Sequence, residues 1–227
     1  MDHPKGPQAK SRPGYAVSLF VTFEGPDGSG KTTQVARLAE RLRAAGHDVI
    51  ATREPGGTRI GDQVRAILHT PENRSMRPVT ELLLYCASRA QLVSEVIRPH
   101  LERGGIVLSD RYADSSLAYQ GYGRGIDLAP LRAILAFATD GLRPDLTLLL
   151  DLDAEEGLRR RRGSGGEWNR LDQEAVAFHT RVREGYLALA HAESDRWVVI
   201  DAARGADEVQ GDIRAEVEKR LRVKRDA

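Results

Sequence analysis

Short apolar segments alternate with longer segments of helical periodicity along most of the chain. Strands are predicted where β-branched and apolar residues run together, at 17–24, 48–53, 106–109, 146–150 and 197–200. Helices are predicted where apolar residues recur with helical spacing, at 31–45, around 60–68, from 80 toward 99, and at 128–139, 154–162, 171–192 and 206–221. This alternation indicates an α/β fold, in which helices cover both faces of a five-stranded parallel sheet.

The body of the chain is predicted to be one domain between two short tails. Residues 1–16 are rich in Pro, Gly and Lys and lack apolar periodicity, so we expect a disordered N-terminal tail. A single domain is expected over 17–222, followed by a C-terminal tail over 223–227. Gly163 to Gly166 interrupt two predicted helices, and such a break is compatible with a lid over about 159–170.

Composition and charge narrow the classes of function. The 227 residues include 34 basic and 33 acidic side chains, so the charge excess typical of nucleic-acid binding is missing and we expect no nucleic-acid partner. The apolar segments are too short to cross a bilayer, so no membrane association is expected. Cys86 is the single cysteine and the first residues carry no apolar signal core, which together indicate a cytoplasmic protein.

The loop after the first predicted strand carries the clearest chemical signal. Residues 25–32, Gly-Pro-Asp-Gly-Ser-Gly-Lys-Thr, match the phosphate-binding pattern of the P-loop NTPases, and the flanking strand and helix disfavour an accidental glycine-rich turn. Lys31, the only lysine between Lys10 and Lys219, can reach the β and γ phosphates of ATP, and the Thr32 hydroxyl can hold Mg²⁺. We therefore expect the three-layer P-loop NTPase fold. The predicted ATP contacts are Gly25, Pro26, Asp27, Gly28, Ser29, Gly30, Lys31, Thr32 and Thr33.

Two pairs of polar residues could act beside this loop. Asp110 and Arg111 follow the third predicted strand, where a carboxylate can hold Mg²⁺ and a guanidinium can bridge two phosphates; a structural ion pair is the alternative. Tyr85 and Arg89 lie four residues apart and so share a helix face. They could contact a flat base, or could be a half-buried ring beside a surface arginine.

Arginines gather around the glycine break. Four of them are consecutive, from Arg159 to Arg162, and Arg170 follows the break. Because consecutive residues cover all sides of a helix, most of these arginines are expected to face solvent. One of them could close over a substrate and stabilise charge in the transition state. The phosphate loop itself supplies no arginine, since Ser29 precedes Gly30.

Together these residues resemble the thymidylate kinases, which phosphorylate dTMP with ATP. The resemblance covers Leu19 to about Arg214 and rests on five segments in the family's order: FEGPDGSGKTTQ, TREPGGT, LYCASRAQ, DRYADSSLAYQGYGRG and NRLDQEAVAFHTRVREGYLALA. A phosphate loop without arginine, combined with a lid that contains arginine, is similar to the common bacterial subtype.

The resemblance implies a role for each matching residue. Asp27 is implied to lie near the sugar 3′-hydroxyl, and a cis bond between Glu54 and Pro55 would direct Arg53 and Glu54 into the site. Tyr85 replaces a phenylalanine that stacks on thymine, and Tyr119 matches a ring that disfavours a 2′-hydroxyl. The implied dTMP contacts are Asp27, Arg53, Glu54, Tyr85, Arg89, Arg111, Ser116, Tyr119 and Gln120.

The resemblance also implies the reaction. Lys31, Arg111 and one lid arginine would act on the phosphates, with Arg162 or Arg170 preferred and Arg159 third, while Thr32 and Asp110 hold Mg²⁺. The γ-phosphoryl of Mg-ATP would pass to dTMP, giving dTDP and ADP for dTTP biosynthesis. The adenine contacts are expected from the lid and from residues near 203–205.

A homodimer is also implied, with the helix around 82–97 as a candidate interface, although that apolar face could equally be buried within one chain. Three other functions stay open on the residues alone. They are another mononucleotide or deoxynucleoside kinase on the same fold, a P-loop switch or partition ATPase, and a degenerate homologue that binds nucleotide for a regulatory or scaffolding role.

Overall fold

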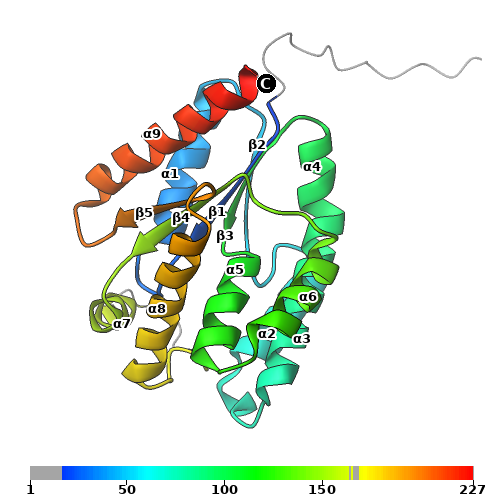
Figure 1. Cartoon of the computed structure of the whole chain (residues 1–227), viewed down its shortest axis with the longest axis vertical. Coiled ribbons are helices and arrows are strands. Elements are labelled where there is room, and N and C mark those ends of the chain that lie inside the picture. The colour runs from blue at the N-terminus through cyan, green and yellow to red at the C-terminus, as the bar shows by residue number, and fades with distance from the viewer. Residues whose placement is uncertain (1–16, 164, 166–168, 227) are drawn as a thin grey trace, which may run out of the picture.

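A single parallel sheet organises the part of the chain that this computed structural model describes, residues 17–163, 165 and 169–226. Within these residues the sheet has five strands in the order β2-β3-β1-β4-β5, and every neighbouring pair is parallel (Figure 1). The strands are β1 (Leu19–Glu24), β2 (Val49–Arg53), β3 (Ile106–Asp110), β4 (Leu146–Asp151) and β5 (Trp197–Asp201). The α/β class and the predicted strands are therefore confirmed.

Helices cover both faces of the sheet. The α-helices are α1 (Lys31–Ala44), α2 (Arg59–His69), α3 (Pro78–Leu92), α4 (Arg98–Glu102), α5 (Ala113–Ser116), α6 (Leu128–Thr139), α7 (Ala154–Gly163), α8 (Val176–Ala192) and α9 (Ala206–Arg225). Helices α1 and α9 lie on one face, and α3, α6 and α8 lie on the other (Figure 1). None of the described helices combines the length and apolar character that a membrane span requires.

Side chains of the central strand β1 alternate between the two helical layers. Leu19, Val21 and Phe23 are buried in a core shared with α1 and α9, whereas Phe20 packs in a separate core on the opposite face. Successive side chains of a strand point to opposite faces, so this alternation follows from the backbone. Glu24 consequently points away from α1 and α9, and its carboxyl group is fully buried.

Several helix boundaries differ from those predicted. Helix α8 begins at Val176 rather than at 171, because residues 170–173 form a turn in which the Asn169 side chain accepts hydrogen bonds from the N–H groups of Leu171 and Asp172. Helix α9 runs to Arg225, so residues 223–225 are helical and not a tail. The expected tail over 1–16, residues 164 and 166–168 of the expected lid, and Ala227 lie outside the described residues.

The helix predicted from 80 toward 99 is present, whereas the helical segment over 113–123 was not predicted. The helix that begins at Pro78 continues past Leu92 through the π-helical segment η2 (Val93–Ile97) into α4, which contains Pro99, a residue without an N–H donor. After β3, α5 continues into a second π-helical segment, η3 (Leu117–Gly123). Segments of this kind often occur at functional sites. A short 3₁₀ turn, η1 (Pro71–Asn73), lies between α2 and α3.

The contact between α9 and the sheet is predicted to carry much of the stability of this layer. Ile213 is fully buried on α9, whereas Val223 on the same helix is 59% exposed. Replacing Ile213 with Ala should lower the free energy of unfolding by about 2–5 kcal/mol, because it leaves a cavity in the core. Val223→Ala should change it by less than about 0.5 kcal/mol. Urea denaturation measures both, and equal losses would contradict this packing.

Candidate active site

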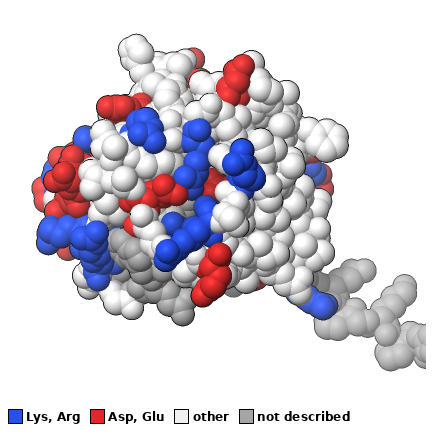
Figure 2. Space-filling model, turned by 90° about the horizontal axis from the view of Figure 1, so that it is seen from below, with Lys and Arg blue, Asp and Glu red and all other residues white. Residues whose placement is uncertain are grey.

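A pocket of about 440 Å³ opens beyond the carboxyl ends of β1, β2 and β3. Figure 2 looks onto this end of the molecule and shows Lys and Arg side chains gathered around a hollow. Open parallel sheets bind their ligands beyond the carboxyl ends of the strands, and the residues predicted to form the site lie at this edge. The predicted site residues that line the pocket are Asp27, Gly28, Gly30, Lys31, Thr32, Thr33, Arg53, Glu54, Tyr85, Asp110, Arg111, Ser116, Tyr119 and Gln120.

The phosphate loop connects β1 to the N-terminus of α1. Gly25, Gly28 and Gly30 have φ angles of 136°, 79° and 89°, a region that side chains other than glycine rarely adopt. Gly28 also contacts α7, since a Cβ atom there would lie 2.1 Å from the carbonyl oxygen of Gly157. Glycine is therefore required at position 28 for two reasons, the turn of the loop and its contact with α7.

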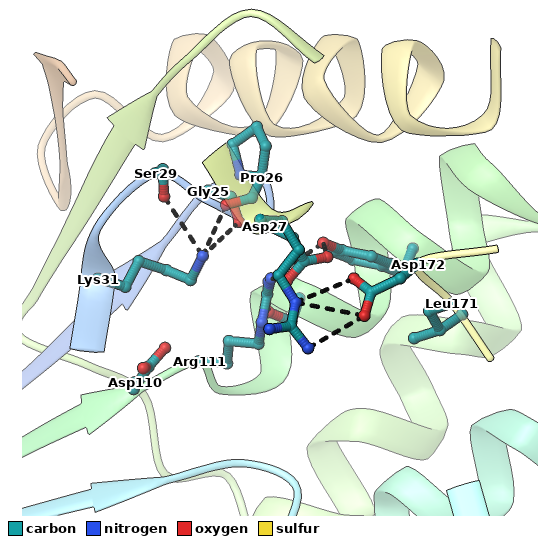
Figure 3. A network of polar contacts seen from close by, with 12 residues as sticks. Gly25, Pro26, Asp27, Ser29, Lys31, Asp110, Arg111, Leu171 and Asp172 are labelled. Carbon is teal, nitrogen blue, oxygen red and sulfur yellow. Dashed lines mark hydrogen bonds and ion pairs between the residues drawn. The ribbon is translucent and has the colours of Figure 1, made fainter. Parts of the chain in front are cut away.

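Lys31 extends under the loop (Figure 3). Its Nζ donates to the carbonyl oxygens of Gly25 and Pro26 at 3.1 and 2.7 Å and to Ser29 Oγ at 3.3 Å. Burial and the nearby charge of Arg111 lower the pKa of Lys31 from 10.5 to about 8. A bound polyphosphate would bring negative charge to this ammonium group and raise its pKa again.

Thr32 and Asp110, the two predicted Mg²⁺ ligands, meet at the mouth of the pocket. The Thr32 hydroxyl donates to Asp110 Oδ2 at 2.5 Å, although the residues are 78 positions apart. A hydroxyl and a carboxylate are oxygen ligands of the kind that Mg²⁺ accepts. Among the described residues, no group of three or more His, Cys, Asp and Glu residues could hold a metal ion. A magnesium ion here would need oxygens from water and substrate.

Arg111 projects across the pocket from a left-handed backbone position, with φ at 74°. Its N–H donates to the Phe23 carbonyl at 2.9 Å, and its carbonyl accepts from Ser109 Oγ at 2.7 Å, so both sides of the residue are held. A non-glycine residue in this conformation is strained, and such strain often accompanies function. The guanidinium lies over the ring of Tyr119, 4.9 Å from its centroid.

Asp27 is the carboxylate that faces Arg111 inside the pocket. Arg111 Nη2 donates to Asp27 Oδ1 at 2.7 Å, and the Tyr119 hydroxyl donates to Asp27 Oδ2 at 2.8 Å. Burial raises the pKa of Asp27, but the positive charges of Arg111 and Lys31 outweigh that effect and hold it well below the usual range. Asp27 is therefore ionised at every pH at which the protein would be assayed.

Arg89 lies behind the pocket wall and is not among its lining residues. Its Nε donates to Glu54 Oε2 at 2.7 Å, and its Nη1 donates to Ser116 Oγ at 3.1 Å. Both partners do line the pocket, so Arg89 supports two lining side chains. The cis bond between Glu54 and Pro55 that the resemblance implies is present. The alternative of a surface arginine beside Tyr85 is wrong, because Arg89 is only 1% exposed.

The two lid arginines preferred from the sequence do not reach the pocket wall. Arg162 is exposed, and Arg170 is buried, with its Nη2 2.5 Å from Glu81 Oε2 and its Nε donating to the Leu68 carbonyl at 3.1 Å. The arginines of α7 that line the pocket are Arg160 and Arg161. The catalytic roles expected for Arg162 and Arg170 therefore stay predictions, and in this structure Arg170 forms a buried ion pair with Glu81.

Comparison with known proteins gives the family. The family model described as thymidylate kinase matches residues 23–213. The chain belongs to the thymidylate kinase family. A thymidylate kinase of Deinococcus radiodurans is 58% identical over 202 residues, which is 89% of this chain and 97% of that protein. One from Roseiflexus castenholzii is 55% identical over 217 residues, covering 90% and 95% of the two chains.

A solved structure supports the same assignment. The crystal structure of thymidylate kinase from Ehrlichia chaffeensis aligns with a TM-score of 0.72 at 34% identity, and the match covers 88% of this chain and 99% of that one. The P-loop kinase fold predicted from the phosphate loop is therefore confirmed for this member of the thymidylate kinase family.

Eight lining residues of this family member were not among the predicted site residues: Pro55, Arg65, His69, Ser115, Arg160, Arg161, Asn169 and Leu171. Arg65 and His69 share the inward face of α2 with the buried Gly61 and Leu68. Their helical spacing from these two residues is present in the sequence and could have indicated that both polar side chains point inward. Burial, together with the charge of Arg65, lowers the pKa of His69 to about 4, so His69 is neutral near pH 7. Arg161 follows Gly157 by four residues and so lies on the face of α7 that meets the phosphate loop.

The lowered pKa of Lys31 predicts proton uptake when ATP binds. At pH 8.5 much of the free protein has a neutral Lys31, and the charge of the triphosphate raises the lysine pKa, so binding should take up a substantial fraction of one proton. Calorimetry at pH 8.5 in two buffers of different ionisation enthalpy measures this uptake. The Lys31→Met variant should show none, and buffer-independent enthalpies for the wild type would contradict the prediction.

The Arg170 contacts predict a role in stability. Arg170→Met would leave the buried Glu81 carboxylate with Arg124 and Gln120 only, so the free energy of unfolding should fall by about 3 kcal/mol. Arg162→Met should change it by less than about 0.5 kcal/mol. Thermal and urea denaturation provide the measurement. A stable Arg170→Met protein with a strongly reduced turnover would support the catalytic role first expected for Arg170.

Proposed function

We propose that this protein is a dTMP kinase that transfers the γ-phosphoryl group of Mg-ATP to dTMP, giving dTDP and ADP. The main support is that one pocket joins a complete phosphate loop to a second cationic centre at Arg111, 80 residues further along the chain. A protein that only hydrolyses ATP needs the first centre alone, whereas a kinase must also hold an acceptor. Membership of the thymidylate kinase family makes dTMP that acceptor.

The chemistry requires alignment and charge neutralisation rather than a general base. A phosphate monoester is already anionic near neutral pH, so its oxygen can attack without losing a proton to the protein. Lys31 would contact the β and γ phosphates of ATP, and Arg111 would hold the acceptor phosphate against the transferred group. Preorganised charges of this kind are worth several kcal/mol of transition-state stabilisation because they need no reorganisation during the reaction.

Magnesium fits the residues at the mouth of this pocket. Thr32 and Asp110 would hold the ion, with water and phosphate oxygens as its remaining ligands. When bound, Mg²⁺ would supply positive charge that neutralises the oxygens of the β and γ phosphates.

The acceptor side of the proposal uses the polar wall opposite the phosphate loop. Arg53 and Arg111 would bind the monophosphate, and Asp27 would face the sugar. Tyr119, whose hydroxyl is fixed by Asp27, would leave no room for a 2′-hydroxyl. The base would stack on Tyr85, and the contacts to its edge would come from Ser116 and Gln120, with Arg89 holding Ser116 from behind the pocket wall.

The lid completes the donor side. Arg160 donates to the Ala202 carbonyl at 2.9 Å, and it connects α7 to the residues after β5 from which adenine contacts are proposed. Arg161 Nη2 lies 3.1 Å from Asp172 Oδ2, and the Asp172 carboxylate is fully buried. We propose that Arg161 is the lid arginine that approaches the transferred phosphate.

The proposal includes a homodimer in the cytoplasm. Leu82 and Ile97, expected as part of the interface, are buried within this chain. Three other apolar side chains of the same helical layer are exposed instead, namely Val79 and Leu83 on α3 and Phe137 on α6, which is 90% exposed. Because α3 and α6 contact each other, these side chains favour that layer as the dimer surface.

ADP production from Mg-ATP tests the function. With dTMP, dUMP, UMP, dCMP, AMP and thymidine offered separately, we expect rapid ADP formation with dTMP and at least about tenfold lower kcat/KM with UMP, because Tyr119 opposes a 2′-hydroxyl. The control omits the acceptor. Slow ADP release that no acceptor changes would indicate a switch or partition ATPase, and preference for another monophosphate would reassign the substrate.

A further inference from the structure

A buried carboxylate lies directly behind Arg111, outside the pocket lining. Glu24 is the last residue of β1 and is fully buried on the face of the sheet that carries α8. The reaction described above makes no use of it. A buried charge destabilises a protein unless it is paired or fully hydrogen-bonded, so a buried carboxylate at this position requires an explanation.

Three donors satisfy the Glu24 carboxylate. Glu24 Oε1 accepts from the backbone N–H of Tyr112 at 2.8 Å. Glu24 Oε2 accepts from the Ser115 hydroxyl at 2.5 Å and from the Tyr186 hydroxyl at 2.9 Å. The Ser115 and Tyr186 hydroxyl oxygens also lie 2.8 Å from each other, so each hydrogen could be directed at the other hydroxyl or at Glu24. Charge-assisted bonds to a carboxylate are stronger than bonds between neutral groups, so the bonds to Glu24 take both hydrogens.

The same two hydroxyls receive the Arg111 guanidinium. Arg111 Nη1 donates to Tyr186 at 2.9 Å and to Ser115 Oγ at 3.2 Å. A guanidinium can only donate hydrogen bonds, and each hydroxyl has a single hydrogen. Because that hydrogen is directed at Glu24, the hydroxyl oxygens of Ser115 and Tyr186 present lone pairs to Arg111.

We propose that Glu24, acting through Ser115 and Tyr186, is a positioning residue that orients the Arg111 guanidinium for phosphoryl transfer. The inference rests on the proposed kinase function. The other end of the guanidinium is held separately, since Arg111 Nη2 bonds to Asp27 and Tyr119. Loss of the Glu24 contacts would therefore free one side of Arg111 and let the fork rotate toward Asp27.

The charges around Glu24 are consistent with this arrangement. Burial and the nearby Asp114 of α5 raise the pKa of Glu24 to about 7, while Arg111 lowers it. The Lys31 ammonium group on α1 and the Tyr186 hydroxyl on α8 also interact electrostatically with the Glu24 carboxyl group. The carboxyl is thus mostly ionised at pH 8, and the kinetic test is carried out at that pH.

Glu24→Gln and Tyr186→Phe test the proposal. Both oxygens of the Glu24 carboxylate accept hydrogen bonds, whereas the amide of Glu24→Gln has only one acceptor oxygen. In the variant, the amide NH₂ group must therefore face a group that is itself a donor. We expect kcat with dTMP to fall about 10- to 100-fold in Glu24→Gln, as for other residues that orient a functional side chain. Tyr186→Phe should fall less, because Ser115 remains. The KM for ATP should stay within about twofold, since Lys31 keeps its contacts.

The control is Thr139→Val, which removes a buried hydroxyl of α6 that donates to the Leu135 carbonyl outside the pocket. It measures the effect of losing a buried hydroxyl alone, and its kcat should match the wild type. If Glu24→Gln lowers kcat no more than Thr139→Val, the proposal is wrong.

A double-mutant cycle decides whether Glu24 acts through Arg111. In an Arg111→Lys background, which removes the fork, the further effect of Glu24→Gln on kcat should shrink to less than about twofold. Equal losses in both backgrounds would show that Glu24 acts independently and would overturn the proposal.

A crystal structure of ligand-free Glu24→Gln tests the same point without turnover. We expect the Arg111 guanidinium to lose its contacts with Ser115 and Tyr186, and an unchanged guanidinium would overturn the proposal. If the wild-type protein makes no dTDP, the kinase function fails, and this structure still decides whether Glu24 orients Arg111.

Discussion

The parallel pairing of β1 with β3 is the constraint on which the site depends. The register places Phe23 opposite Asp110, and the Arg111 N–H continues the ladder with a bond to the Phe23 carbonyl. The phosphate loop and the Asp110-Arg111 pair therefore leave the sheet side by side. Because neighbouring parallel strands cannot slip by one residue without moving buried side chains to the wrong face, the distance between donor and acceptor centres is fixed by the core.

The pocket keeps its cations in place with buried acceptors rather than with solvent. Arg111 bonds to Asp27 on one side and to the hydroxyls oriented by Glu24 on the other, and Lys31 bonds to loop carbonyls. An exposed arginine would sample many rotamers and would lose that freedom on binding. Anchored charges avoid this loss and are already oriented when the phosphates arrive, which is the physical basis of electrostatic preorganisation.

Short sequence motifs predicted those parts of the site whose residues are close together in the sequence. The phosphate loop and the pairs at the strand ends follow from short motifs and from the alternation of strands and helices, and the pocket brings them together. The helix over 113–123 was missed because its Ser, Gly and Tyr residues show no apolar period. The pairing of Arg170 with Glu81 depends on tertiary packing across 89 positions, which no local pattern contains.

The arginines of α7 show why the sequence alone could not identify which of them line the pocket. Four consecutive arginines cover every side of α7, so the helical phase decides which of them face the pocket. That phase is set where Gly157 contacts the phosphate loop, since a Cβ there would lie 2.5 Å from the Asp27 carbonyl. Arg160 and Arg161 follow Gly157 by three and four positions and so turn toward the loop, whereas Arg162 turns outward. A glycine contact therefore determines which lid arginines line the pocket.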